Sequence, residues 1–495
     1  MRTVGFDNEK YLKLQSEKIN ERISEFGGKL YLEFGGKLFD DFHASRVLPG
    51  FEPDSKIRML KELRDKAEIV IVISANDIER NKVRGDLGIT YDLDLLRLVD
   101  AFRACELYVG SVVITHFAAQ PAAEKFKQRL EGLGLKVYRH YVIPDYPSNT
   151  PFIVSDEGFG KNEYIETERS LIVVTAPGPG SGKMATCLSQ LFHEHQRGVK
   201  AGYAKFETFP IWNLPLKHPV NLAYEAATAD LDDVNMIDPF HLEAYGETTI
   251  NYNRDVEIFP VLNAMMTKIC GVSPYKSPTD MGVNMVGFCI TDDAVCREAG
   301  RQEIIRRFFS ASCAVRQGNS SQNELFKIEM IMKHVEVSAA DRAVVPPALK
   351  KAEDTGAPAV SIELQDGRIV TGKTSSLLGS ASACLLNALK ALGGIPDDVL
   401  LISPEVIEPI QQLKVNHLGN RNPRLHTDEI LIALSICAAT DENAACAVEQ
   451  LPKLRFCEAH STVILSRVDE NVFQHLGVNI TFEPQYLTHR LYHAK

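Results

Sequence analysis

The sequence predicts an α/β protein in three parts, and three changes of pattern along the chain carry this prediction. Up to residue 221, short apolar and β-branched runs alternate with amphipathic helical patterns, which is typical of a mostly parallel, doubly wound sheet. From residue 222 the pattern is mainly helical, and after residue 338 a hairpin precedes further helices and strands. We expect an N-terminal α/β domain over 1–221, a helical domain over 222–338 and a C-terminal α/β domain over 339–495, with Val344–Pro347 as a linker.

The strands of the N-terminal domain are expected where apolar runs stop at turn residues. An amphipathic helix over residues 8–26 comes first, and helical patterns near 55–66, 91–104 and 121–131 connect later strands. Because parallel strands need such crossover helices, their carboxyl ends should meet at one edge, where ligands bind in this class of fold. The expected strands are Leu30–Phe34, Ile69–Ser74, Tyr108–Thr115, Lys136–Tyr141, Leu171–Thr175 and Ala201–Phe206.

The stretch Leu171–Gln196 combines a strand, a glycine-rich loop and a helix. Apolar or β-branched residues form the strand, and Lys183 follows the loop directly. After the lysine, apolar residues recur at i, i+3, i+4 and i+7, which is the pattern of one helix face. This order is the context that a phosphate-binding P-loop requires, because loop N–H groups, the helix N-terminus and the lysine all favour an anion.

The predicted phosphate contacts come from the loop and the start of the helix. Lys183 would bridge the outer phosphates and is a catalytic candidate, because its charge would stabilise a transferring group. A strand-to-helix turn that binds nothing is the alternative interpretation. The backbone N–H groups that would hold the phosphates belong to Gly178, Gly180, Ser181 and Gly182.

The magnesium contact of the predicted site is irregular. The stretch Gly178–Lys183 is similar to the adenylate kinase variant of the P-loop, but Met184 stands where most P-loops have a Mg²⁺-binding hydroxyl. Thr186 lies two positions beyond that place. Asp77, just after the strand Ile69–Ser74, is therefore the second catalytic candidate and would organise Mg²⁺. An N-terminal helix cap at Asp77 is an equal alternative.

A second stretch, Gly367–Thr374, fits the P-loop pattern G-x-x-x-x-G-K-[ST] to the letter. Its context is that of a hairpin, because residues 361–364 and 368–371 alternate as strands around Asp366-Gly367. A hairpin strand cannot wrap a phosphate, so we expect no anion site there.

The two later parts contain helices of ordinary length. In the middle part they are expected at 223–231, 255–270, 294–317 and 323–335. In the C-terminal part we expect a hairpin, a helix over 380–392, a strand at 399–402, a helix from Pro404, a helix over 428–439, and strands at 462–466 and 478–482.

The order of the C-terminal elements is similar to that of the cytidine deaminase fold. Deaminases carry H-x-E and P-C-x-x-C motifs at the starts of two helices. The corresponding places here read Ser380-Ala-Ser382 and Ser403-Pro-Glu-Val406, so no zinc is expected.

Composition excludes several classes of protein. The chain has 495 residues, a net charge of −11 and no apolar run of bilayer length, so neither a nucleic acid nor a membrane is an expected partner. Its start lacks the apolar segment of a signal peptide, which predicts a cytoplasmic location. The ten cysteines are scattered without a C-x-x-C pair, which predicts no metal centre built from cysteine. His489 and His493 could share a metal, but no third ligand is near in sequence.

Along its whole length the chain resembles an uncharacterised bacterial family of about 500 residues, uncharacterised protein family 0371 or domain of unknown function 1846. The resemblance rests on APGPGSGKMATCLSQL, FETFPIWNLPLKHPVNLAYEAATADL, YKSPTDMGVNMVGFCI and DGRIVTGKTSSLLGSASA. It implies the three-part body described above, with a deaminase-like scaffold at the C-terminus. It implies no activity.

The residues therefore predict a small phosphorylated ligand and no more specific substrate. The leading hypothesis is an enzyme that uses ATP or another nucleotide with Mg²⁺ for phosphoryl transfer or hydrolysis. The alternatives are a non-catalytic binding or regulatory protein, and an enzyme of another class whose loop holds a substrate phosphate. A homo-oligomer is compatible with each of them.

Overall fold

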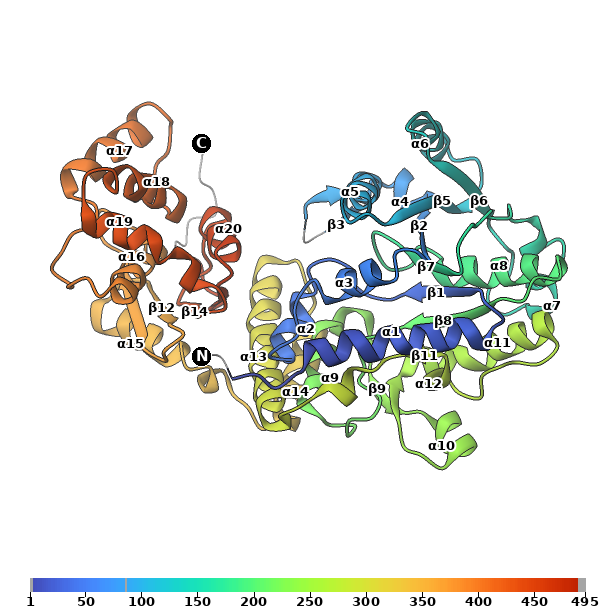
Figure 1. Cartoon of the computed structure of the whole chain (residues 1–495). Helices are drawn as coiled ribbons and strands as arrows, with labels where there is room; N and C mark the ends of the chain where they lie inside the picture. The colour runs from blue at the N-terminus through green and yellow to red at the C-terminus, as the bar shows by residue number, and fades with distance from the viewer. Residues whose placement is uncertain (1–2, 85–86, 488–495) are drawn as a thin grey trace. The chain divides into compact units, whose positions relative to one another are not determined.

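The computed structural model describes residues 3–84 and 87–487 and has two compact units (Figure 1). One unit runs from Val4 to Ala299 and the other begins at Gly300, within the long helix α13 (Asp293–Gln317). Both units combine helices with a sheet, so the protein has the predicted α/β class. The domain boundaries at residues 221 and 338 stay predictions. In the described ranges, no helix is both long and apolar enough to cross a bilayer.

The first unit is built on a parallel sheet of seven strands in the order β11-β8-β1-β7-β2-β5-β6. Apolar residues dominate its central strands, which are buried along their whole length, as expected for a sheet covered on both faces. Six strands were predicted, and all six are confirmed with small shifts at their ends. The bounds are β1 (Leu30–Phe34), β2 (Ala67–Ser74), β5 (Tyr108–Phe117), β6 (Lys136–Tyr141), β7 (Leu171–Thr175), β8 (Gly202–Phe206) and β11 (Gly282–Val283).

The connections of the sheet diverge beside β7. From β2 the chain continues to β5, whereas from β7 it crosses in the opposite direction to β8. Neighbouring strands whose connections diverge leave a crevice at their carboxyl ends, and ligands of doubly wound proteins bind in that crevice. The topology thus places the loop after β7 at the expected binding edge.

Helices cover this sheet. The face that carries Tyr31, Val174 and Tyr203 packs against α8 and α11. Figure 1 shows α1 running alongside α3, β8 and β11, in agreement with their contacts. The helices of this unit are α1 (Asn8–Glu25), α2 (Phe42–Val47), α3 (Ser55–Glu62), α4 (Ala75–Glu79), α5 (Tyr91–Ala104), α6 (Pro121–Gly132), α7 (Thr150–Ile153), α8 (Lys183–Gln196), α9 (Pro219–Ala227), α10 (Pro239–Tyr245), α11 (Asn253–Cys270) and α12 (Pro278–Met281).

The segment expected to be helical, 222–338, also contains three short strands. β9 (Asn235–Ile237) and β10 (Ile250–Tyr252) pair antiparallel with each other, and β11 joins β8 at the edge of the large sheet. Strands of two or three residues are too short to show a period of two in the sequence. Only the pairing partners reveal them.

The second unit holds a mixed sheet of four strands in the order β13-β12-β14-β15. β12 (Ala359–Glu363) pairs antiparallel with β13 (Ile369–Lys373) and with β14 (Glu458–Ser461), and β14 pairs in parallel with β15 (Asn479–Phe482). The hairpin is therefore confirmed. The helices are α14 (Gln322–His334), α15 (Val345–Thr355), α16 (Ser380–Gly393), α17 (Pro404–Asn416), α18 (Thr427–Cys437), α19 (Glu442–Glu449) and α20 (Arg467–His475).

Three expectations for this part of the chain were wrong. Residues 399–402 form no strand, because Leu401 and Ile402 are buried by packing in the core without a neighbouring strand. The strand expected at 462–466 lies earlier, at Glu458–Ser461. Three of its four side chains are polar, so the sequence shows no apolar run there. Val344–Pro347 is no linker, because α15 begins at Val345 with prolines in its first turn, where they are tolerated. The deaminase-like arrangement stays a prediction.

Candidate functional site

The loop after β7 is shaped by two glycines with left-handed backbone. Gly180 has φ of +73° and Gly182, which caps α8, has φ of +88°. A residue with a Cβ is strained in this region, so the sequence folds here only because glycine stands at both places. The predicted strand, loop and helix therefore follow one another as expected, with Lys183 as the first residue of α8.

The loop presents backbone donors without acceptors. Pro179 has no N–H group, and across the described residues no protein group accepts a hydrogen bond from the N–H groups of residues 178 and 180–183. The hydroxyl of Ser181 also has no partner among the described residues, although Ser181 is only 2% exposed. Free donors at a helix N-terminus, together with the helix dipole, make a favourable place for an anion.

The Lys183 side chain is half-buried at the same place, and it forms no ion pair with any described residue. Its charge acts on the first turns of α8. Burial raises the pKa of the Cys187 thiol, the Glu33 carboxylate raises it further, and Lys183 lowers it. A cation from α8 and a carboxylate from β1 therefore have opposite effects on the same thiol.

Two side chains from outside the loop hold it in place. The Thr115 hydroxyl on β5 donates a hydrogen bond of 2.6 Å to the carbonyl oxygen of Ser181. The phenol of Tyr91 lies so close to Gly178 that a Cβ there would be 2.3 Å from its oxygen. Glycine is thus required at residue 178 because the Tyr91 ring leaves no room for a side chain. Its backbone conformation does not require glycine, since its φ is not in the left-handed region.

The predicted residue Asp77 lies in α4, directly after β2, but it does not cap that helix. Ser74 is the cap, and its hydroxyl accepts the N–H of Asn76. The Asp77 carboxylate pairs with Lys82 at 3.4 Å. It also acts on His116 of β5: burial lowers the pKa of this imidazole and Asp77 opposes that shift.

The two residues considered for a magnesium contact in α8 face the core. Met184 packs against the apolar cluster under the helix, and the Thr186 hydroxyl is fully buried with no partner among the described residues. Met184 therefore offers no oxygen to a metal, and the Thr186 hydroxyl is enclosed by the protein. No three carboxylate, histidine or cysteine side chains in the described part of the chain are arranged to hold a metal ion. His489 and His493 lie outside the described residues.

The competing stretch Gly367–Thr374 is a hairpin strand, as predicted. Val370 and Thr371 pair with Ile362 and Ser361 across β12 and β13. A Cβ at Gly372 would lie 2.2 Å from the backbone nitrogen of Cys384 in α16. This glycine therefore lets a helix approach the strand and has no part in a phosphate loop.

Sequence reasoning missed residues on both sides of the loop. Thr115 and Tyr91 come from β5 and α5, and they meet the loop only in three dimensions. On the other side, Glu33 accepts a hydrogen bond of 2.7 Å from Tyr203. For Glu33 and Thr115 a signal existed, because each lies at or near the carboxyl end of a predicted strand.

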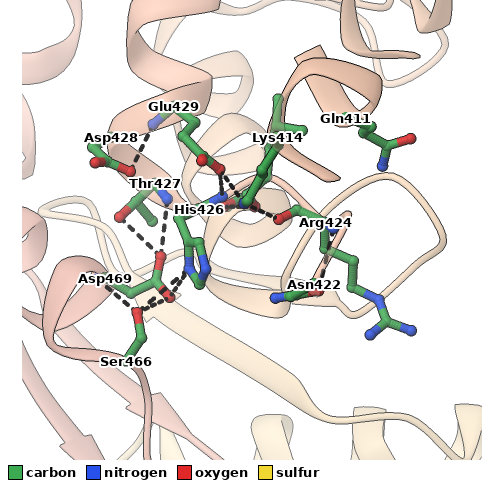
Figure 2. A network of polar contacts seen from close by, with 12 residues as sticks. Gln411, Lys414, Asn422, Arg424, His426, Thr427, Asp428, Glu429, Ser466 and Asp469 are labelled. Carbon is green, nitrogen blue, oxygen red and sulfur yellow. Dashed lines mark hydrogen bonds and ion pairs between the residues drawn. The ribbon is translucent and has the colours of Figure 1, made fainter. Parts of the chain in front are cut away.

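The second unit has its own connected polar network (Figure 2). His426 Nδ1 lies 2.9 Å from Asp469 Oδ2, and the same carboxylate accepts hydrogen bonds from Ser466 and from the N–H and hydroxyl of Thr427. The hydrogen bond to Asp469 raises the pKa of His426, although burial opposes this. The network joins the starts of α18 and α20.

A buried ammonium completes this network. Lys414 is 2% exposed and donates to Glu429 at 2.6 Å and to the carbonyl oxygen of Arg424 at 2.7 Å. Glu429 also accepts the backbone N–H of His426. Every charge that Figure 2 shows in the centre of the network has a protein partner, so we interpret it as a structural element.

Comparisons with known proteins agree with the resemblance seen in the sequence. Residues 4–336 match the model of "Domain of unknown function DUF1846, N-terminal", and residues 340–492 match that of "Domain of unknown function DUF1846, C-terminal". The chain belongs to the DUF1846 family.

Similar full-length relatives are known from several bacteria. A UPF0371 protein of Streptococcus thermophilus is 58% identical over 492 residues, which cover 99% of this chain and all of the relative. A UPF0371 protein of Corynebacterium urealyticum is 59% identical over 493 residues and 99% of each chain. None of these names states an activity, so the function of this DUF1846 chain must be argued from its site.

Proposed function

We propose that this protein binds the phosphate group of a small molecule at the loop Gly178–Lys183. The observation that carries the proposal is the set of N–H groups at residues 178 and 180–183, which have no acceptor in the described part of the chain and lie at the start of a helix. Lys183, which pairs with no described residue, lies beside them. The buried hydroxyl of Ser181, also without a described partner, adds a further donor. The position at the carboxyl edge beside β7 supports it as well.

The geometry favours a loop that holds a substrate phosphate over one that holds a magnesium nucleotide. Met184 and Thr186 face the core, and Asp77 is paired with Lys82. A transferring phosphate needs metal or cationic groups around it, whereas a bound substrate phosphate needs only N–H donors and a lysine. Metal-dependent phosphoryl transfer is retained as the second candidate because Asp77 lies just after β2, beside β7.

Isothermal titration with inorganic phosphate and with ATP tests the proposal. Lys183→Ala should weaken binding by about 10- to 100-fold, because a hydrogen bond to a charged group contributes about 1.5–3 kcal/mol. Lys373→Ala, in the hairpin that fits the P-loop pattern, is the matched control and should leave the affinity unchanged. Loss of binding in Lys373→Ala with retention in Lys183→Ala would reverse the proposal.

A further inference from the structure

A cluster of charged side chains lies around β8, which is separated by β1 from β7, the strand that leads into the loop. Lys205 on β8 forms ion pairs with Asp255 of α11 at 2.5 Å and with Glu207 at 2.8 Å. Glu33 belongs to the same group, because it lies directly opposite Lys205 in the register of β1 and β8. We call Glu33, Lys205, Glu207 and Asp255 the Lys205 cluster.

The Lys205 cluster has more negative than positive groups. Three carboxylates surround one ammonium, and the nearby Asp233 is paired with Arg254. Burial, together with the charges of Asp255 and Glu33, raises the pKa of Glu207 to about 7 in spite of Lys205. Partly buried charge that lacks a counter-charge is unfavourable, so the cluster is suited to a further cation.

A buried hydroxyl without a partner lies among these carboxylates. Tyr252 is 5% exposed, and its oxygen has no hydrogen-bond partner among the described residues. Burial is the largest cause of the raised pKa of this phenol, and Tyr224 is the second. The carboxylates of Glu207, Asp233 and Asp255 raise the pKa further. Tyr252 is the last residue of β10 and directly precedes α11, which carries Asp255 in its first turn. The buried hydroxyl therefore lies on the segment that leads into the Lys205 cluster. This observation is independent of the ion pairs themselves.

The register of the sheet connects the Lys205 cluster to the loop. Glu33 lies opposite Lys205 on one side and opposite Val174 of β7 on the other, so the three side chains share one face. The loop begins directly after β7, and α8 covers the same face. Val174, the register partner of Glu33, packs in the same apolar cluster as Cys187 of α8, so the carboxylate lies on the face of the sheet that α8 covers.

We propose that the Lys205 cluster binds the ammonium group of the ligand whose phosphate the loop holds. The substrate class is then a phosphorylated primary amine, with Glu33 as the main contact of the ammonium. Glu33 suits this role because the Tyr203 hydroxyl occupies only one of its oxygens. Metal ligation is a poorer use of the cluster, because its carboxylates are not grouped as a metal site. This inference rests on the proposed function of the loop.

Matched pairs of small phosphates test the inference by isothermal titration on the full chain. Each ω-aminoalkyl phosphate with two, three or four carbons is compared with the alkyl phosphate of the same length. At least one amine should bind about tenfold or more tightly than its partner, as expected for a charge-assisted hydrogen bond. Glu33→Gln should abolish that preference and leave the affinity for alkyl phosphates unchanged, because glutamine keeps an acceptor for Tyr203.

Glu131→Gln is the control for the loss of one negative charge, since Glu131 is exposed and its single ion pair among the described residues is with Lys127 on its own helix. It should keep the preference for amines. Circular dichroism and thermal unfolding establish that each variant is folded, and Asp255→Asn replaces Glu33→Gln if the latter is not.

The outcomes distinguish the two proposals. If no alkyl or aminoalkyl phosphate binds, the proposed function fails. If alkyl phosphates bind as tightly as every aminoalkyl phosphate, or if Glu33→Gln and Asp255→Asn both keep the preference, only the inference about the ammonium group is overturned.

Discussion

Thr115 fastens the loop at Ser181. Its hydroxyl donates a hydrogen bond of 2.6 Å to the carbonyl oxygen of Ser181, although β5 and β7 are separated by β2 in the sheet. This bond turns the Ser181 peptide so that its carbonyl points at β5. In the described part of the chain, no protein group accepts the N–H groups of Gly182 and Lys183 that follow.

Removing this hydrogen bond should weaken anion binding. Thr115→Val keeps the shape of the side chain but leaves the Ser181 carbonyl without its donor, which costs about 1–3 kcal/mol for a buried group. If this cost falls on the bound state, we expect an about 5- to 150-fold loss of phosphate affinity in calorimetry. Thr115→Ser should restore most of it, and an unchanged affinity in Thr115→Val would show that the loop does not need this bond.

Gly178 should tolerate no side chain while Tyr91 is present. Gly178→Ala places a Cβ 2.3 Å from the phenol oxygen, and overpacking of this kind costs about 1–3 kcal/mol. In a Tyr91→Ala background the cost should largely disappear, which a double-mutant cycle of urea unfolding measures. Gly180→Ala is the contrast: its Cβ meets open space, so its smaller cost comes from φ and should be independent of Tyr91.

Magnesium should matter little for ligand binding if the loop holds a substrate phosphate. Titrations with ATP in Mg²⁺ and in EDTA should then give affinities within about a factor of three. If Mg²⁺ does strengthen binding, Asp77→Asn should remove more of the gain than Thr186→Ala, because the Thr186 hydroxyl is fully buried. A large Mg²⁺ dependence that Asp77→Asn removes would favour phosphoryl transfer.

The pair His426–Asp469 should make the contact between α18 and α20 sensitive to pH. The hydrogen bond to Asp469 raises the pKa of His426 above 6.5, so its contribution is complete below about pH 6.5 and is lost as the pH rises through the folded-state pKa. Burial disfavours the Asp469 carboxylate, but His426, Thr427 and Ser466 hold its pKa below 3.8. Its contribution is therefore lost only as the pH falls through that lower pKa.

Hydrogen exchange of peptides from Thr427–Cys437 and Arg467–His475 measures this in the full chain. After correction for intrinsic exchange, protection should be greater at about pH 5.5 than at about pH 8.5. His426→Gln should reduce the difference. The same pH dependence in wild type and His426→Gln would show that another group is responsible.

Arg342 should stabilise the second unit far more than an exposed arginine does. It is 1% exposed and bonds Glu458 at 2.7 Å, Thr481 at 3.1 Å and two backbone carbonyls. Arg342→Ala should cost about 3–5 kcal/mol, because it breaks a buried network. The exposed pair of Arg368 with Asp366 is the control, and Arg368→Ala should cost far less, because solvent screens an exposed ion pair. Urea unfolding compares the two, and equal costs would contradict the role of Arg342.

The elements that could be predicted from the sequence are those whose conformation depends on residues close together in the chain. The strands around β7 are buried on both faces, so each appears as one apolar run. The backbone of the loop needs glycine at residues 180 and 182, where φ is positive. The spacing of these two glycines can be recognised in the sequence. The hairpin around Asp366-Gly367 was likewise predictable from its turn, and that context correctly decided against the better P-loop match.

The tertiary structure decided everything that depends on distant partners. Thr115 and Ser181 are 66 residues apart, Glu33 and Tyr203 are 170 apart, and no local pattern announces such pairs. Strand β11 is two residues long and exists only because β8 offers it a free edge. The sequence by itself determined the loop and the apolar strands, because backbone conformation and burial are local needs. The groups that surround the loop were decided by packing, because the sheet brings together strand ends that lie far apart in the chain.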